Sequence, residues 1–330
     1  MNKAPVSVVV PAYNSEASLP LLVERLSSVF AADERAFELI LVDDGSRDRT
    51  WDVIQQLARG SRVVRGFRMA RNYGQHNALL CGIRAARYAI VVTLDDDLQN
   101  PPEEAPRLLA KLEEGFDVVY GTPLKQAHGF WRDIASVATK VVLQSALGAK
   151  TARKVGPFRA FRTKVRAAFQ DYRGSNVSID VLLTWGARSF TAIEVRNDPR
   201  PFGASNYTFL KLIHHAIDIM TGFSTLPLQA ATIVGFVFTL FGMVLLAWIL
   251  GRYMILGYSV PGFPFLGSAI AIFSGAQLFA LGVIGEYIAR IHVRVMGRPS
   301  YAIEAETGDG QNVAATDQPV ATAPLNQFQP

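Results

Sequence analysis

Short apolar runs alternate with segments of helical spacing along the first hundred residues of the chain. Four of these runs are typical of buried strands, namely residues 6–10, 37–42, 62–67 and 89–94. The segments 17–30 and 75–86 place apolar side chains three or four positions apart, which predicts helices. Strands and helices therefore alternate, and the pattern predicts an α/β domain with a mixed, mostly parallel sheet flanked by helices.

The second half of the chain contains two long stretches without a charged residue. Residues 219–251 and 253–285 hold no Asp, Glu, Lys or Arg, and each includes an apolar segment long enough to cross a membrane. A buried core helix is the alternative for one such stretch, but two in tandem after an α/β domain favour membrane spans. We therefore expect a two-helix transmembrane hairpin with spans at 226–250 and 263–286.

The segment just before the first span has the pattern of an amphipathic helix. Phe209 and Ile213 fall on one side of such a helix, whereas Lys211 and His214 fall elsewhere. A helix of a soluble core is the alternative, but the position beside a span favours an interfacial helix that lies on the membrane within residues 206–225.

Basic residues flank the predicted hairpin. Lys211 precedes the hairpin and Arg290 and Arg294 follow it, whereas the connection between the spans carries only Arg252. By the positive-inside rule, both termini and the α/β domain face the cytoplasm. The first residues lead straight into a strand and not into the apolar core of a signal peptide. We expect a multi-pass protein of the inner (cytoplasmic) membrane, and the net charge of +5 suits an anionic lipid surface.

An acidic run follows the fourth predicted strand. Asp95 and Asp97 share a face if the strand continues, and the amide oxygen of Gln99 can join them as a third oxygen ligand. Open α/β sheets bind ligands at the carboxyl ends of their strands, and Asp43 and Asp44 end another strand. The run predicts a Mg²⁺ or Mn²⁺ site for substrate phosphates, although a bare Asp-x-Asp alone would more often be a solvated loop.

Several motifs, in this order, resemble those of family-2 glycosyltransferases with a GT-A (Rossmann-like) fold. They are Val9-Val10-Pro11-Ala12-Tyr13-Asn14, Val42-Asp43-Asp44-Gly45-Ser46, Arg71-Asn72-Tyr73-Gly74-Gln75-His76, Leu94-Asp95-Asp96-Asp97-Leu98-Gln99-Asn100-Pro101-Pro102-Glu103 and Gly285-Glu286-Tyr287-Ile288-Ala289-Arg290. The resemblance covers roughly residues 5–303 and is to the polyprenyl-phosphate glycosyltransferases, which include dolichol-phosphate mannose synthase. The similarity is strongest to bacterial transferases that act on undecaprenyl phosphate, especially those for 4-deoxy-4-formamido-L-arabinose.

The resemblance assigns the donor side of the site. In this family the loops after the first two strands bind the nucleotide, and the implied donor-binding residues are Pro11, Tyr13, Glu16, Asp44, Asp95 and Asp96. Asp97 is implied as a catalytic metal ligand, and Arg200 as a catalytic cation at the leaving diphosphate.

The resemblance also assigns the acceptor side. Arg132 and Ser136 match the family's Arg-x-x-x-Ser pair for the acceptor phosphate, with Arg132 counted as catalytic, and Arg159 is a further candidate. A polyprenyl phosphate is largely ionised at neutral pH, so its oxygen is already a nucleophile and needs no strong general base.

These features together predict a metal-dependent, inverting glycosyltransferase. It moves one sugar from a nucleotide sugar, preferably a UDP-sugar, to a polyprenyl phosphate at the cytoplasmic membrane face, and we expect no nucleic-acid partner. One alternative is a processive polysaccharide synthase of the same fold, although the Gln-x-x-Arg-Trp motif of that group is absent. Another is a noncatalytic nucleotide-binding membrane protein. The family and the small residues of the hairpin suggest a homo-oligomer, with a tetramer as one form.

The predicted organisation divides the chain into six parts. They are a glycosyltransferase domain (1–205), a juxtamembrane helix and linker (206–225), two membrane helices (226–250 and 263–286), a cytoplasmic segment (287–306) and a disordered tail (307–330).

Overall fold

A computed structural model describes residues 3–123, 155–174, 177–199, 225–256 and 263–308. In this part of the chain one sheet has the order β7-β5-β6-β4-β1-β2-β3-β8. Its strands are β1 (Val6–Ala12), β2 (Phe37–Asp43), β3 (Val64–Met69), β4 (Ile90–Thr93), β5 (Val118–Pro123), β6 (Arg159–Arg162), β7 (Phe190–Val195) and β8 (Ile303–Thr307). The pairs β1–β2, β2–β3, β1–β4 and β5–β7 are parallel, whereas β3–β8, β4–β6 and β5–β6 are antiparallel. The predicted mixed, mostly parallel sheet is confirmed.

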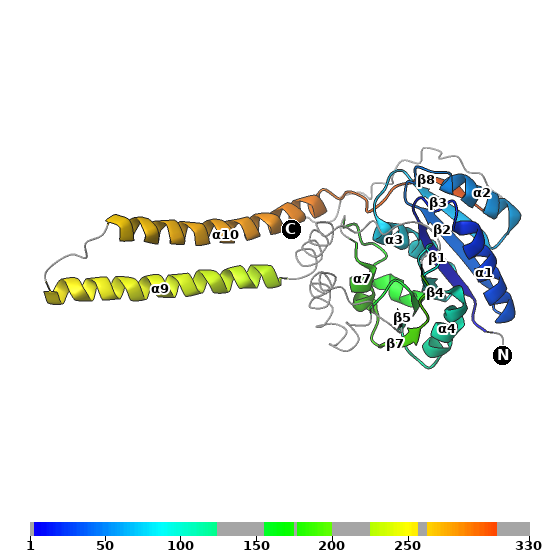
Figure 1. The fold of residues 1–330 in the computed structure, drawn as a ribbon, viewed down its shortest axis with the longest axis horizontal. Helices are drawn as coiled ribbons and strands as arrows, with labels where there is room; N and C mark the ends of the chain where they lie inside the picture. The colour runs from blue at the N-terminus through cyan, green and yellow to red at the C-terminus, as the bar shows by residue number, and fades with distance from the viewer. Residues whose placement is uncertain (1–2, 124–154, 175–176, 200–224, 257–262, 309–330) are drawn as a thin grey trace, which may run out of the picture.

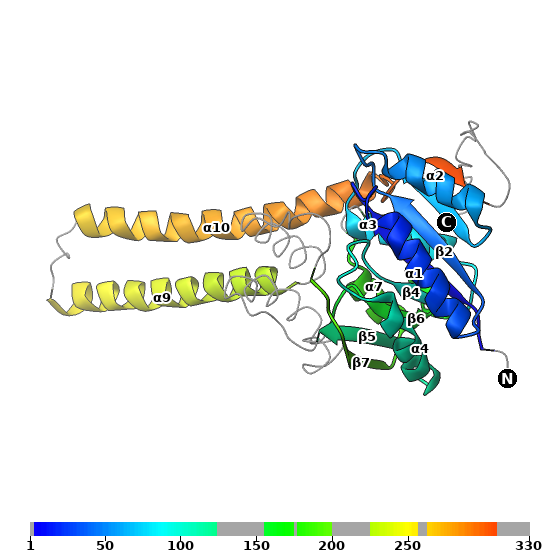
Figure 2. The same cartoon turned by 45° about the vertical axis from the view of Figure 1, so that its right-hand side comes forward.

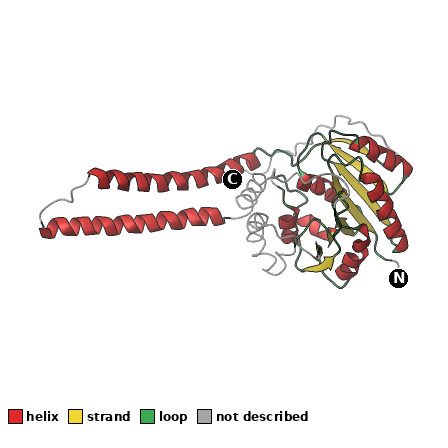
Figure 3. Ribbon diagram, viewed as in Figure 1, coloured by secondary structure: helices red, strands yellow, loops and turns green. Residues whose placement is uncertain are grey.

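Helices cover both faces of this sheet (Figure 3). They are α1 (Leu19–Ala32), α2 (Thr50–Gly60), α3 (Gln75–Ala85), α4 (Ala105–Glu113) and α7 (Ile179–Gly186), with the 3-10 helices η1 (Pro102–Glu104) and η2 (Thr163–Ala168). One core lies between the sheet and α1, α2 and α4, and a second lies between the sheet and α3, α7 and η2.

The apolar runs in the sequence follow from this three-layer arrangement. Val8 and Val10 of β1 belong to the core under α1, whereas Val9 belongs to the core under α3. A strand buried on both faces needs apolar residues at consecutive positions. Gly82 brings α3 close to the sheet, because a Cβ at this position would lie 2.4 Å from Cγ1 of Val9.

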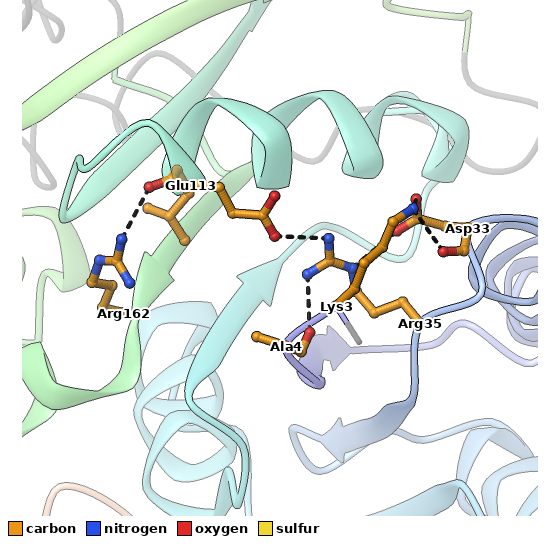
Figure 4. A network of polar contacts seen from close by, with 7 residues as sticks. Lys3, Ala4, Asp33, Arg35, Glu113 and Arg162 are labelled. Carbon is orange, nitrogen blue, oxygen red and sulfur yellow. Dashed lines mark hydrogen bonds and ion pairs between the residues drawn. The ribbon is translucent and has the colours of Figure 1, made fainter. Parts of the chain in front are cut away.

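A hydrogen-bonded cluster around Arg35 ties elements together at the amino end of β1 (Figure 4). The buried guanidinium of Arg35 donates to Ala4 O, to Asp33 and to Glu113, each at 2.9 Å. These bonds join the chain before β1 to the end of α1 and the end of α4. They stabilise the side of the sheet opposite to the carboxyl ends of the strands.

Two long apolar helices, α9 (Leu226–Leu256) and α10 (Phe263–Val295), extend side by side away from the sheet domain (Figures 1 and 2). Each contains a stretch long and apolar enough to span a membrane, Pro227–Ile255 and Ile272–Val295. The most apolar part of each stretch is unburied in the structure, as a lipid-facing helix is and a core helix is not. In both views the N-terminus lies on the far side of the domain from this hairpin, so β1 runs towards the hairpin.

Residues 287–306, predicted as a cytoplasmic segment after the hairpin, include the end of α10 and strand β8. Helix α10 continues to Val295, and the chain then returns to the domain as β8, which pairs antiparallel with β3. Ser300 donates to Gly174 O at 2.9 Å, and Ala70 N donates to Ala302 O at 3.0 Å. The sheet of the α/β domain therefore includes residues that follow the hairpin. The predicted interfacial helix at 206–225 lies almost entirely outside the described residues.

Candidate active site

The candidate site lies at the carboxyl ends of β1, β2, β3 and β4, where the acidic motifs follow the strands. Hydrogen bonds join the loop after β1 to the loop after β2. Asn14 N donates to Ser46 Oγ at 3.0 Å, and Arg49 N donates to a carboxylate oxygen of Glu16 at 2.9 Å. Ser15 N donates to Thr50 Oγ1 at 2.7 Å. The two predicted nucleotide-binding loops thus form one hydrogen-bonded surface.

The predicted donor residues of the β1 loop differ in exposure. Pro11 is buried at the end of β1, whereas Glu16 is exposed and the Tyr13 side chain is 39% exposed. A partly exposed aromatic ring at a strand end is available to stack on a ligand. Tyr13 N donates to Ser15 Oγ at 3.0 Å, which fixes the backbone beside the ring.

Asp44 links the end of β2 to the loop after β3. Its carboxylate accepts hydrogen bonds from Tyr73 N at 2.7 Å and from Gly74 N at 2.8 Å. The pKa of Asp44 is raised from 3.8 to about 6, first by burial and also by the charge of the neighbouring Asp43, against the lowering effect of these two bonds. Asp44 is therefore a carboxyl group whose protonation changes near neutral pH.

Asp43 lies beside a contact that the sequence analysis missed. Its Oδ1 accepts from Ser46 N at 2.9 Å, and its fully buried Oδ2 has no hydrogen-bond partner among the described residues. Arg68 Nε lies 3.7 Å from Oδ2, because Asp43 and Arg68 are partners in the register of β2 and β3. The same Nε lies 3.5 Å from Glu304 on β8. No local sequence signal could have indicated the contact with Glu304, because it depends on the return of β8 to the sheet.

Side chains of the acidic run point to different neighbours. Asp95 Oδ1 accepts from Gln75 Nε2 at 2.6 Å, and Asp97 Oδ1 accepts from Gln99 N at 3.0 Å. Between Asp97 and Gln99, Leu98 has a φ of 59°, which a bulky side chain rarely adopts. The Leu98 side chain is 1% exposed, so its burial holds this strained turn in place.

Asp96 points away from its two neighbours and towards the β1 loop. Ser15 Oγ donates a hydrogen bond to its Oδ2. Burial raises the pKa of Asp96, the Ser15 bond lowers it, and the charge of Asp97 raises it. Asp96 therefore connects the acidic run to the loop that carries Tyr13, and its predicted contact with the donor stays a prediction.

The oxygen ligands of the acidic run suit a hard divalent cation that also binds the phosphates of the substrate. Asp95, Asp97 and Gln99 are all partly exposed, and Gln99 N donates to Asp97 Oδ1 within the turn after β4. In the described part of the chain, no three His, Cys, Asp or Glu side chains gather as a complete metal cage. Mg²⁺ characteristically uses one or two carboxylates together with substrate phosphates, and this arrangement supplies such a partial set.

The predicted acceptor residues are only partly described. Arg132, Ser136 and Arg200 lie outside the described residues, and their roles stay predictions. Arg159 is described and lies in β6, where its side chain is 1% exposed and forms an ion pair with Asp180. Its predicted contact with the acceptor phosphate is likewise untested.

Comparison with known proteins places the chain among glycosyltransferases. Residues 7–169 match the model of glycosyl transferase family 2. The chain is 37% identical to undecaprenyl-phosphate 4-deoxy-4-formamido-L-arabinose transferase of Serratia proteamaculans over 93% of this chain and 95% of that protein. It is 39% identical to the protein of the same name from Proteus mirabilis, over 92% of this chain and 94% of that one.

Solved structures agree at the level of the fold. Glucosyl-3-phosphoglycerate synthase of Mycobacterium tuberculosis, crystallised with Mn²⁺, uridine diphosphate and phosphoglyceric acid, superposes with a TM-score of 0.50 at 20% identity. The match covers 66% of this chain and 76% of that chain. The predicted glycosyltransferase fold and the predicted resemblance are both confirmed, and the chain belongs to glycosyl transferase family 2.

Proposed function

We propose that this enzyme transfers one sugar from a nucleotide sugar to a polyprenyl phosphate at the cytoplasmic face of the inner membrane. The observation that carries the proposal is the hydrogen bond from Ser15 to Asp96, which joins the acidic run after β4 to the connected loops after β1 and β2. The high identity to undecaprenyl-phosphate transferases over almost the whole chain supports undecaprenyl phosphate as the acceptor. A UDP-sugar is the preferred donor.

The donor side follows from the two joined loops. Tyr13 offers a ring at the surface, and Asp44 is held by Tyr73 N and Gly74 N, so the nucleoside has an aromatic and a carboxyl group to contact. Pro11 and Glu16 complete the loop on which this surface is built. The bonds between the loops keep these groups in place before the donor binds, which lowers the entropy lost on binding.

The acidic run serves the leaving diphosphate. Asp95, Asp97 and Gln99 would hold Mg²⁺ or Mn²⁺, and the ion when bound neutralises charge on the diphosphate as the bond to the sugar breaks. Gln75 and the buried turn at Leu98 orient these ligands before the ion binds. Arg200, outside the described residues, is the predicted second source of positive charge for the diphosphate.

The acceptor needs positioning more than activation. Its phosphate oxygen is ionised at neutral pH and attacks the anomeric carbon on the face opposite the diphosphate, which inverts the configuration of the sugar. Arg132 and Ser136, outside the described residues, are the predicted phosphate contacts. Because β1 runs towards the hairpin, its carboxyl end lies on the side of the domain where a lipid-linked phosphate would be presented.

The membrane arrangement extends the proposal. Helices α9 and α10 span the membrane as a hairpin, with the sheet domain and both termini on the cytoplasmic side. We also propose a homo-oligomer, with a tetramer as the form to test first. Crosslinking in native membranes should give bands larger than the monomer, and a monomer alone would contradict the assembly.

The test is transfer of a labelled sugar into lipid. Radiolabelled UDP-sugars and GDP-sugars are incubated separately with the purified protein, undecaprenyl phosphate and Mg²⁺ or Mn²⁺, and the lipid is extracted. The panel includes a UDP-4-deoxy-4-formamido-L-arabinose donor, because the curated relatives are named for that sugar. Label in the lipid that EDTA abolishes is the expected result. A folded protein that labels no lipid with any donor would contradict the proposal.

A further inference from the structure

Four buried polar side chains form a cluster under the acidic run, and we call them the β4 cluster: Thr93, Tyr120, Arg159 and Asp180. Arg159 forms an ion pair with Asp180 through Nη1, and its Nε donates to Thr93 Oγ1 at 3.1 Å. Tyr120 Oη donates to Asp180 Oδ1 at 3.2 Å. All four side chains are buried, so water does not compete for these bonds.

The β4 cluster joins three strands and a helix at one level of the sheet. Thr93, Arg159 and Tyr120 are neighbours across β4, β6 and β5, and Asp180 lies in the first turn of α7. Thr93 is the last residue of β4 and precedes Asp95 by two positions. The direction in which the acidic run leaves the sheet is therefore set at this level.

A second set of contacts connects α7 to the same run through the start of α3. Ile179 N, at the start of α7, donates to Nδ1 of His76 at 3.4 Å. The neighbouring Gln75 donates to Asp95 at 2.6 Å. These contacts link β4 to β6 and β6 to α7. They then link α7, through the start of α3, back to Asp95 after β4.

Stability alone does not explain a buried pair of this kind. Removing a guanidinium and a carboxylate from water costs several kcal/mol per ion, and well-packed apolar residues often serve stability as well. A buried pair is better suited to fixing one arrangement of the chain. The guanidinium of Arg159 is also turned towards three protein oxygens, those of Asp180, Thr93 and Pro157, and is 1% exposed.

We propose that Arg159 and Asp180 are positioning residues that hold the end of β4 so that Asp95 and Asp97 can bind the metal–diphosphate group. This inference rests on the proposed function, because it concerns the metal site of that reaction. It differs from the predicted contact of Arg159 with the acceptor phosphate. The positioning role predicts a change in metal binding, whereas a phosphate contact predicts a change in acceptor binding.

The test compares Arg159→Lys with Arg65→Lys in the full-length protein. Arg65 is a matched control because its Nη1 pairs with the buried Glu38 at 3.0 Å, near the starts of β3 and β2. Binding of Mn²⁺ in the presence of UDP is measured by electron paramagnetic resonance, without turnover. The KM for undecaprenyl phosphate and the melting temperature are measured on the same proteins.

The expected result is that Arg159→Lys weakens Mn²⁺ binding about tenfold, as for other residues that orient metal ligands. The acceptor KM should stay within about twofold of that of the wild type, because no acceptor contact is lost. Arg65→Lys should leave Mn²⁺ binding unchanged even where it lowers the melting temperature. Tyr120→Phe, which removes only one hydroxyl group, should weaken Mn²⁺ binding in the same direction and carries the test if Arg159→Lys fails to fold.

Two results would overturn the inference. One is a raised acceptor KM in Arg159→Lys with unchanged Mn²⁺ binding, which would make Arg159 an acceptor contact. The other is an equal effect of Arg65→Lys and Arg159→Lys on Mn²⁺ binding, which would make the role purely structural. Failure of the proposed function is distinguishable from both, because the wild type itself would then bind no Mn²⁺ with UDP.

Discussion

Carboxylates that are adjacent in the sequence lie in different surroundings at this site. Asp43 is fully buried, Asp96 accepts a hydrogen bond from Ser15, and Asp95 and Asp97 are partly exposed. A buried carboxylate must be paired or lose its charge, whereas a partly exposed one can keep its charge and exchange water for a metal ion. The carboxylates of the site are therefore distinguished by their surroundings and not by residue type.

Asp97→Asn should reduce transfer by at least about a hundredfold, because it removes a negative charge from the proposed metal site. Asn has the same size and can still accept from Gln99 N, so the fold should persist. The measurements are label in extracted lipid and the melting temperature. Asp52→Asn, on the exposed face of α2, is the control and should keep normal transfer. Normal turnover of Asp97→Asn would contradict the assignment.

Asp44 should give the stability of the protein a distinctive dependence on pH. Its pKa is raised from 3.8 to about 6, so between these values the folded chain holds a proton that the unfolded chain has released. The contribution of Asp44 to the free energy of unfolding therefore falls as the pH rises through this window. Melting temperatures of the wild type and Asp44→Asn from pH 4 to pH 7 test this.

The difference in melting temperature, wild type minus Asp44→Asn, should decrease as the pH rises. Carboxyl groups whose pKa is lowered, such as Asp33 and Asp117, have the opposite effect but are present in both proteins and cancel in the difference. A difference that is constant or grows with pH would contradict the raised pKa of Asp44.

At the residue scale, the sequence was informative where a side chain follows directly from its strand. Asp95 and Asp97 lie at the end of β4 as expected, because the apolar run before them ends there. The bonds from Ser15 to Asp96 and from Gln75 to Asp95 could not be predicted. They join residues 81 and 20 positions apart, and only the packing of the strands brings such residues together.

At the element scale, the strands buried on both faces were predictable and the edge strand was not. The run 6–10 was extended by two residues in β1, because Pro11 and Ala12 are also buried. By contrast, β8 has the sequence Ile-Glu-Ala-Glu-Thr and is mostly exposed. Such a short, polar strand is typical of a sheet edge, and its pairing with β3 depends on the length and direction of α10.

Strand β8 should be required for stability, and two truncations separate it from the tail. Removal of residues 303–330 deletes β8, leaves β3 as an exposed edge and removes Glu304 from Arg68. We expect a loss of a few kcal/mol, or about 5 °C or more in melting temperature. Removal of residues 309–330 keeps β8 and should leave the melting temperature unchanged. Equal melting temperatures of the two truncated proteins would contradict a structural role of β8.

At the scale of the whole molecule, the hairpin and the site are connected through the chain that follows α10. Helix α10 leads through Ser300 and Ala302 into β8, and β8 pairs with β3 next to the loop held by Asp44. The distance between the donor site and the membrane is therefore constrained by a short piece of chain. An enzyme that joins a soluble donor to a lipid-linked acceptor needs such a constraint, because the two reacting atoms must lie at the same distance from the membrane.

The proposed orientation places residues 257–262, which connect α9 and α10, on the outer side of the membrane. Cys81 is the only cysteine of the chain and is buried, so Cys81→Ala gives a background without thiols. In this background, Ser259→Cys should react with a membrane-impermeant maleimide on intact cells. Arg62→Cys, in the exposed turn after α2, should react only after the membrane is permeabilised. The reverse pattern would place the sheet domain outside, away from cytoplasmic nucleotide sugars. Labelling of both cysteine variants only after permeabilisation would mean that the hairpin does not cross the membrane.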